Sequence, residues 1–205
     1  MIRIAIIGDI GSGKSYVAKL FGFPVFNADA EVAKIYKKNK NCFKKLKKKL
    51  PNFIKTFPIE KKEITSAILS SRKNLKKIIK IVHPEVNSKM KSFIAKHKKN
   101  KYLVLDIPLI LENKININKD IIIFVDAKKK EIDKKLKKRP NINLKVVRKF
   151  RKIQLSLELK RKKSTFIIKN NFKNNSVKNN VKYIKKYLIN DRSYPRHRNN
   201  RLVNF

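Results

Sequence analysis

The chain has 205 residues, 41% of them hydrophobic, and carries 55 lysine and arginine residues against 14 aspartate and glutamate residues. This length suits one compact domain with an inserted lobe and is sufficient to bury a core. The single cysteine, Cys42, excludes an internal disulfide and is typical of a reducing compartment. No apolar run reaches the roughly 18 residues of a membrane-spanning helix, and the N-terminus lacks the pattern of a signal peptide. We therefore expect a cytoplasmic protein that does not enter a membrane.

The formal net charge of +41 has two interpretations. A basic chain can bind nucleic acid or attract an anionic substrate. However, the 55 basic residues comprise 45 lysines and only 10 arginines, and lysine, asparagine and isoleucine share A/T-rich codons. The lysines also lie along the whole chain, for example at Lys128–Lys130 and Lys134–Lys135. We interpret most of them as solvated helix faces, keep steering of an anionic substrate as the alternative, and expect no specific nucleic-acid partner.

In chain order, five short segments rich in isoleucine, valine or phenylalanine predict buried strands: Ile2–Ile7, Pro24–Phe26, Tyr102–Leu105, Ile121–Val125 and Phe166–Ile168. They lack strict alternation, as expected when both faces of a parallel sheet are covered. Lysine-rich segments with helical spacing separate them. The pattern predicts a doubly wound α/β fold with a parallel five-stranded sheet.

A phosphate-binding pattern, G-x-x-x-x-G-K-[ST], follows the first predicted strand at Gly8–Ser15. Its glycines let backbone N–H groups surround phosphates, Lys14 reaches the β- and γ-phosphates, and Ser15 offers a hydroxyl to Mg²⁺. Three of the four glycines in the chain lie in this loop. An ordinary strand-to-helix turn does not need that concentration of glycine, so the loop predicts a nucleotide site.

The uneven spacing of the strands predicts insertions. The segment between the second and third strands is longer than one crossover helix needs, and Pro51, Pro58 and Pro84 punctuate its helical patterns. We expect one domain over residues 1–190, followed by a polar tail at 191–205. Its expected parts are a core (1–35, 100–138 and 165–190), a helical insert (36–99) and a second, short helical insert (139–164).

Five blocks of the sequence together resemble the dephospho-coenzyme A kinase family. Ile7–Ser15 is similar to the family's T-G-G-I-G-S-G-K-S, Phe23–Asp29 to F-P-V-x-D-A-D, His83-Pro84 to H-P, Asp106–Glu112 to D-I-P-L-L-F-E, and Gln154–Arg161 to Q-M-P-L-E-E-K-R. The blocks keep the family's order from Ile2 to about Asn170, and Arg139 precedes Gln154 by fifteen residues, as the family's lid arginine does.

This resemblance implies a P-loop kinase domain with a three-layer α/β/α fold, in which the insert at 36–99 binds the substrate and the insert at 139–164 is a lid. It also implies transfer of phosphate from ATP, with Mg²⁺, to the ribose 3′-hydroxyl of dephospho-coenzyme A. Phosphoryl transfer depends mainly on positioning and charge neutralisation. The sequence leaves the oligomeric state open, with a monomer favoured.

The family's site residues transfer onto matching positions of this chain. Asp29 is the expected base for the substrate hydroxyl, and Lys14 and Arg139 are the expected catalytic cations. Ser15 and, through water, Asp106 are the expected partners of Mg²⁺. The residues expected to contact ATP are Gly8, Asp9, Ile10, Gly11, Ser12, Gly13, Lys14, Ser15, Tyr16 and Arg139. Those expected to contact dephospho-coenzyme A are Asp29, His83, Asp106, Pro108 and Glu112.

Several of these residues also have structural interpretations. Asp29 could cap the following helix, His83 could end a helix before Pro84, Arg139 could be a solvated charge, and Glu112 could lie at a helix start. At the level of the whole chain, two alternatives stay open. One is another small-molecule P-loop kinase, and the other is a basic nucleic-acid-binding protein that retains the loop.

The chain also departs from the family pattern. Tyr16 replaces a threonine, Asn27 replaces the first aspartate of D-A-D, Ser164-Thr165 replaces Ala-Asp, and Lys169 stands near a customary aspartate. Lys14, Ser15, Asp29 and Asp106 are all retained. We therefore expect the departures to affect rate and substrate positioning more than the class of reaction.

Overall fold

The structure is a computed structural model that describes residues 1–108, 120–140, 142–190 and 203–204. The chain divides into two compact units. The first contains Met1–Phe26, His97–Ile142 and Gln154–Phe205, and the second contains Asn27–Lys96 and Asn143–Ile153. Among the described residues, no helix combines the length and apolarity that a membrane span requires.

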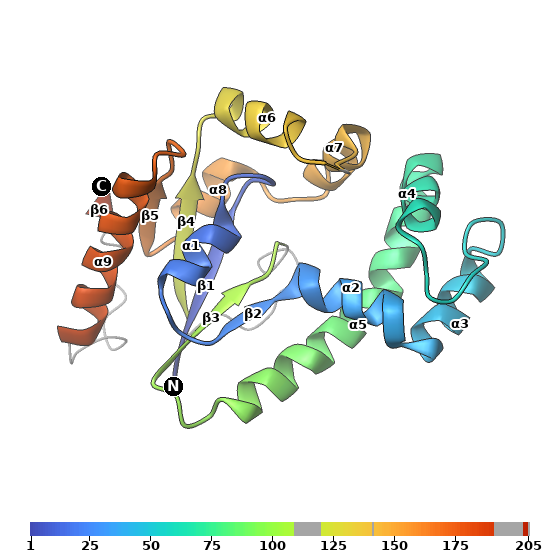
Figure 1. Ribbon diagram of the computed structural model, residues 1–205, viewed down its shortest axis with the longest axis horizontal. Coiled ribbons are helices and arrows are strands. Elements are labelled where there is room, and N and C mark those ends of the chain that lie inside the picture. The colour runs from blue at the N-terminus through green and yellow to red at the C-terminus, as the bar shows by residue number, and fades with distance from the viewer. Residues whose placement is uncertain (109–119, 141, 191–202, 205) are drawn as a thin grey trace. The chain divides into compact units, whose positions relative to one another are not determined.

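The sheet of the first unit has the strand order β2-β3-β1-β4-β5-β6 (Figure 1). Its strands are β1 (Ile2–Gly8), β2 (Val25–Asn27), β3 (Tyr102–Asp106), β4 (Ile121–Asp126), β5 (Phe166–Lys169) and β6 (Val203–Asn204). β1 pairs in parallel with both β3 and β4, and β5 pairs in parallel with β4. The five predicted strands are confirmed, and the two-residue β6 adds a parallel edge next to β5.

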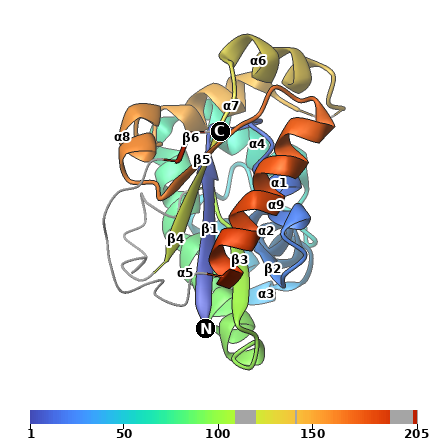
Figure 2. The ribbon, with the colours of Figure 1, turned by 90° about the vertical axis from the view of Figure 1, so that its left-hand side faces the viewer.

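Helices cover both faces of this sheet, which is why its strands are mostly apolar. Figure 2 shows α1 (Lys14–Leu20) and α9 (Asn174–Asn190) on one side of the strands and α8 (Leu157–Lys162) on the other. Alternate strand residues such as Ile4, Ile6 and Val104 are fully buried in one cluster with side chains of α1 and α9. The predicted α/β/α layering is thereby confirmed.

The second unit is helical. Its helices are α2 (Ala28–Lys38), α3 (Lys40–Lys49), α4 (Lys61–Ser70), α5 (Arg72–Lys96) and α7 (Leu144–Arg151). The Lys149 ammonium donates to the carbonyl of Leu69 at 2.7 Å, which ties α7 to the end of α4. The predicted lid stretch, 139–164, is therefore divided, with α7 in the second unit and α8 in the first.

The prediction that Pro84 interrupts the helical pattern is wrong, and with it the possibility that His83 ends a helix. Both residues lie inside the 25-residue helix α5. A proline removes one hydrogen bond from a helix and favours a break. Here the apolar stripe Leu75, Ile78, Val82, Val86 and Met90 continues at helical spacing through the proline and is buried. Packing of this face on both sides of Pro84 outweighs the local preference.

The single cysteine packs in the second unit as an apolar residue. Burial, with a smaller contribution from Glu85, raises the pKa of the Cys42 thiol to about 11. Cys42 is free and buried. Because the thiolate is the reactive form, a thiol with a raised pKa is inert.

One carboxylate organises the start of α4. Glu63, which is 8% exposed, accepts backbone hydrogen bonds from Lys55 at 2.8 Å, Thr56 at 3.1 Å and Glu60 at 3.2 Å. Burial alone would raise the pKa of Glu63. The donated backbone N–H groups outweigh that effect and hold its pKa below the usual value.

We expect Glu63→Gln to lower the free energy of unfolding by about 1–2 kcal/mol at pH 7, because an amide presents one acceptor oxygen where the carboxylate presents two. A carboxyl with a lowered folded-state pKa stabilises the fold above its unfolded pKa, roughly 4.3, and this stabilisation is lost as the pH falls through the folded pKa. Denaturant unfolding of both proteins between pH 7 and pH 3 should show the difference shrinking toward acid pH.

The matched control is Glu31→Gln, which removes a carboxylate that forms a surface ion pair with Lys34 at 2.6 Å. Exposed pairs contribute little, so this variant should differ from the parent by less than about 0.5 kcal/mol. A Glu63→Gln difference that is constant over the whole pH range would contradict the role given to the carboxylate.

Candidate active site

The loop Gly8–Ser15 joins the central strand β1 to α1. Gly11 and Gly13 have φ angles of +87° and +95°, which side-chain-bearing residues rarely adopt. A Cβ placed on Gly13 would lie 2.4 Å from the Nδ2 atom of Asn170, and one on Gly11 would lie 2.9 Å from Leu136. Both positions therefore need glycine for backbone geometry and for space.

Lys14 lies inside this loop and is only 8% exposed. Its ammonium donates to the carbonyl of Asp9 at 2.7 Å, and the same carbonyl accepts from the Ser12 N–H at 3.2 Å. The side chain of Asp9 accepts from the Ile10 N–H at 2.6 Å. Polar groups of the loop itself therefore stabilise the turn, and the Lys14 ammonium is fixed against the Asp9 carbonyl.

Two side chains with oxygen atoms that could bind a metal ion, those of Asp106 and Ser15, lie at this edge of the sheet. Asp106 ends β3, which runs parallel to β1, so it lies at the same edge as the loop. Asp106 is 3% exposed, whereas Ser15 in the first turn of α1 is exposed. Hydroxyl and carboxylate oxygens are the ligand types that Mg²⁺ takes, with water and phosphate oxygens completing its shell. The residues present therefore fit the ion.

The helix that precedes Arg139 packs against the loop. Ile132 and Leu136 of α6 (Lys129–Lys137) lie against Gly11. Arg139 follows two residues after this helix and is exposed, and its backbone N–H donates to the Leu136 carbonyl at 3.2 Å. Pro108, just past β3, is half-buried. Arg139 and Pro108 belong to the same unit as the loop.

The structure excludes the interpretation of Asp29 as the cap of the following helix. The side chain of Asn27 caps α2 by accepting from the Ala30 N–H at 2.7 Å. Asp29 lies in the first turn of that helix, with its side chain exposed. Asp29 is therefore not the cap, and the residue that departs from the family pattern, Asn27, serves that purpose.

Three predicted site residues remain: His83 and Glu112, expected to contact dephospho-coenzyme A, and Tyr16, expected to contact ATP. His83 is half-buried in the middle of α5, in the second unit. Glu112 lies outside the described residues. Tyr16, the replacement for threonine in the loop pattern, has a side chain that is 39% exposed on α1.

Two residues of the first unit were missed by sequence reasoning. Asn170, 5% exposed, follows β5 and donates from its side chain to the Ser12 carbonyl of the loop at 2.8 Å. Lys160, which is 1% exposed, donates to the Gln154 side chain at 3.1 Å, so the interpretation of lysines as solvated is wrong for it. Its neighbours at helical spacing, Leu157 and Ser164, gave no signal of this burial, because Leu157 is itself 44% exposed and serine is polar.

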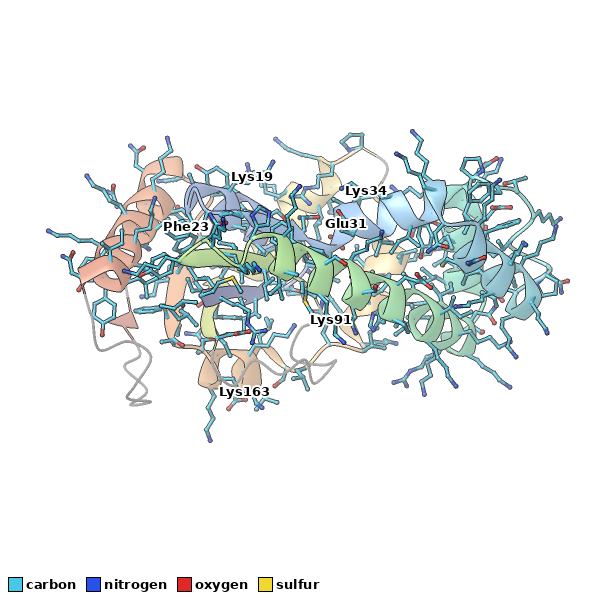
Figure 3. All side chains as sticks on the ribbon, turned by 90° about the horizontal axis from the view of Figure 1, so that it is seen from below. Lys19, Phe23, Glu31, Lys34, Lys91 and Lys163 are labelled. Carbon is cyan, nitrogen blue, oxygen red and sulfur yellow. The ribbon has the colours of Figure 1, made fainter. Side chains whose placement is uncertain are left out.

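A separate cavity of about 510 Å³ lies in the second unit. Its lining comes from α2, the start of α3 and α5: Glu31, Lys34, Ile35, Lys38, Asn39, Lys40, Asn41 and Lys89. Figure 3 shows Glu31 and Lys34 on α2. None of the predicted site residues that the structure describes lines this cavity.

Comparisons with known proteins agree with the geometry of the loop. A sequence model of the dephospho-CoA kinase family matches residues 2–176. The dephospho-CoA kinase of Wolbachia pipientis wMel is 38% identical over 170 residues, which cover 80% of this chain and 87% of that protein.

Solved structures give the same result for the fold. The crystal structure of TT1252 from Thermus thermophilus has a TM-score of 0.73 at 27% identity, covering 92% of this chain and 96% of that one. Dephospho-CoA kinase from Campylobacter jejuni has a TM-score of 0.61 at 22% identity, covering 91% and 96% of the two chains, and supports the fold alone.

Proposed function

The chain belongs to the dephospho-CoA kinase family, and from this premise we propose that Lys14, Asp29, Asp106 and Arg139 carry its phosphoryl transfer. The protein is a kinase that phosphorylates dephospho-coenzyme A, the final step of coenzyme A synthesis. ATP as the donor and the ribose 3′-hydroxyl as the acceptor are part of the proposal.

The loop and its lysine bind the donor. Backbone N–H groups of Gly8–Ser15 surround the phosphates of ATP, and the Lys14 ammonium, already fixed in the loop, balances their charge. Ser15 and Asp106, the latter through water, would hold Mg²⁺, which supplies neutralisation of charge on the β- and γ-phosphates when bound. The burial of Asp106 at the loop's edge of the sheet supports this role.

Asp29 activates the acceptor. Its carboxylate accepts the proton of the 3′-hydroxyl as that oxygen bonds to the γ-phosphorus. The bond from the γ-phosphorus to the β–γ bridging oxygen breaks at the same time, and ADP leaves. Asp29 is exposed just after β2 and does not cap α2, which supports a role for its carboxylate other than starting the helix.

Arg139 supplies a second positive charge to the transferring phosphoryl group. Arg139 is exposed and lies just after α6, the helix that packs against Gly11, which is consistent with this role. A guanidinium presents several donors in a fixed plane and suits phosphate oxygens. A monomeric state and a cytoplasmic location stay predictions.

The observation that carries the proposal is the glycine-dependent loop with its buried lysine, next to a buried aspartate on the neighbouring strand. The direct test is release of ADP from ATP and Mg²⁺ on addition of dephospho-coenzyme A, with adenosine, AMP and shikimate as comparison acceptors. We expect rapid release with dephospho-coenzyme A and little with the others.

A 3′-deoxy analogue of dephospho-coenzyme A separates the position of transfer from simple binding. We expect it to inhibit the reaction competitively and to accept no phosphate. Phosphorylation of this analogue would show that another hydroxyl is the acceptor.

A further inference from the structure

A buried asparagine connects the end of β5 to the phosphate-binding loop. Asn170 donates from Nδ2 to the carbonyl of Ser12, 158 residues away in sequence, at 2.8 Å. Its Oδ1 accepts the backbone N–H of Phe172 at 2.8 Å, and its own N–H donates to the Asp126 carbonyl at 2.6 Å. The donor and the acceptor of each of these three hydrogen bonds are therefore defined.

The two side-chain contacts determine which way the amide is turned. The Phe172 N–H needs an oxygen opposite it, and the Ser12 carbonyl needs an N–H. Phe172 has a φ of +61°, which is unusual for a bulky residue, and the turn that it forms places its N–H against Asn170. An asparagine satisfies both groups at once, whereas an aspartate could satisfy only Phe172.

The contact with Ser12 also fixes the next backbone donor. Among the described residues, the Phe57–Pro58 bond is the cis peptide, so the Ser12–Gly13 peptide is trans. In a planar trans peptide the C=O and N–H groups point in opposite directions. With the Ser12 carbonyl held against Asn170, the Gly13 N–H must point away from Asn170.

Gly13 is the residue at which such control is needed. It precedes α1 with a φ of +95°, and glycine permits rotations of its flanking peptides that other residues exclude. The Asn170 side chain also fills the space that a Cβ on Gly13 would occupy. The asparagine thus replaces, by a hydrogen bond and by contact, the restraint that a side chain would have supplied.

We propose that Asn170 is a positioning residue that holds the Ser12–Gly13 peptide in the orientation that directs the Gly13 N–H toward the bound phosphates. Asn170 acts through this peptide and needs no contact with ATP. The inference rests on the proposed function, because it requires that the loop binds the phosphates of ATP.

The test compares Asn170→Asp with Asn171→Asp. The first keeps the acceptor for Phe172 and removes the donor to Ser12. The second adds the same charge one residue away, at an exposed asparagine whose Oδ1 accepts from Lys173 at 2.9 Å. Dissociation constants for ATP are measured by calorimetry, and those for adenosine, which has no phosphate, are measured by competition.

We expect Asn170→Asp to bind ATP about 10-fold more weakly than Asn171→Asp, as for loss of one oriented hydrogen bond, with adenosine unchanged. ATP affinities within about twofold of each other would overturn the proposal. Equal weakening of ATP and adenosine would overturn it too, because that pattern indicates general damage to the site. If Asn170→Asp does not fold, Asn170→Ala against Asn171→Ala answers the same question.

Lys14→Ala, measured beside them, separates the two hypotheses. If it binds ATP as well as the parent protein does, the loop is not the phosphate site and the proposed function fails. If it loses ATP affinity while Asn170→Asp does not, only the positioning role of Asn170 is wrong.

Discussion

Lys14→Ala should reduce kcat for phosphorylation of dephospho-coenzyme A by roughly 10²–10³-fold, the loss typical of removing one group that stabilises transition-state charge. The ammonium is held in the loop by its hydrogen bond to the Asp9 carbonyl, so it is positioned before the reaction begins. Because Lys14 is buried and makes this hydrogen bond, the free energy of unfolding without ligand should also fall, by about 1 kcal/mol.

The control for Lys14→Ala is Lys19→Ala, which removes the same charge from an exposed position on the same helix (Figure 3). We expect Lys19→Ala to keep parental kcat. Thermal unfolding gives a second readout, because ATP stabilises the folded state in proportion to RT ln(1 + [ATP]/Kd). That stabilisation should shrink in Lys14→Ala alone. A fully active Lys14→Ala enzyme would remove the loop from the mechanism.

Asp29→Asn should lower kcat by roughly 10²–10⁴-fold, the usual contribution of a positioned acid–base group. The KM for dephospho-coenzyme A should change much less, since an amide oxygen still accepts a hydrogen bond from the 3′-hydroxyl. Stability should fall by less than about 1 kcal/mol, the value of a negative charge in the first turn of an exposed helix.

The companion variant Asn27→Asp tests the same segment without touching the base. Aspartate caps helices about as well as asparagine, so α2 should keep its start and kcat should stay near that of the parent. Steady-state kinetics decide between the roles. Loss of a base should leave far less than about a tenth of kcat. If Asp29→Asn keeps more than about a tenth of the parental kcat, catalysis rests on positioning and charge alone.

The parts of this protein that follow from local chemistry were predictable. Strands β1, β3, β4 and β5 are short apolar segments between turns, and each was predicted within one residue of its observed ends. The phosphate-binding loop is equally local, because its glycines, lysine and serine act over eight consecutive residues. Its position after the first strand then places it at the carboxyl edge of the sheet.

Tertiary structure decided what depends on residues far apart in sequence. Pro84 stays inside α5 because packing on either side of it outweighs a local preference. Asn27, a departure from the family pattern, proved to be the cap of α2 only once the start of that helix was placed.

The same distinction applies to the support of the site. The fold class, the phosphate-binding loop and the family could all be predicted from the amino-acid sequence, since each depends on short patterns of residue type. Only the folded chain shows that Asn170 reaches Ser12 and that Lys160 is buried. Hydrogen-bond direction and burial depend on which segments pack together. In a chain rich in lysine and asparagine, the residue type at one position does not show which distant residues that side chain will contact.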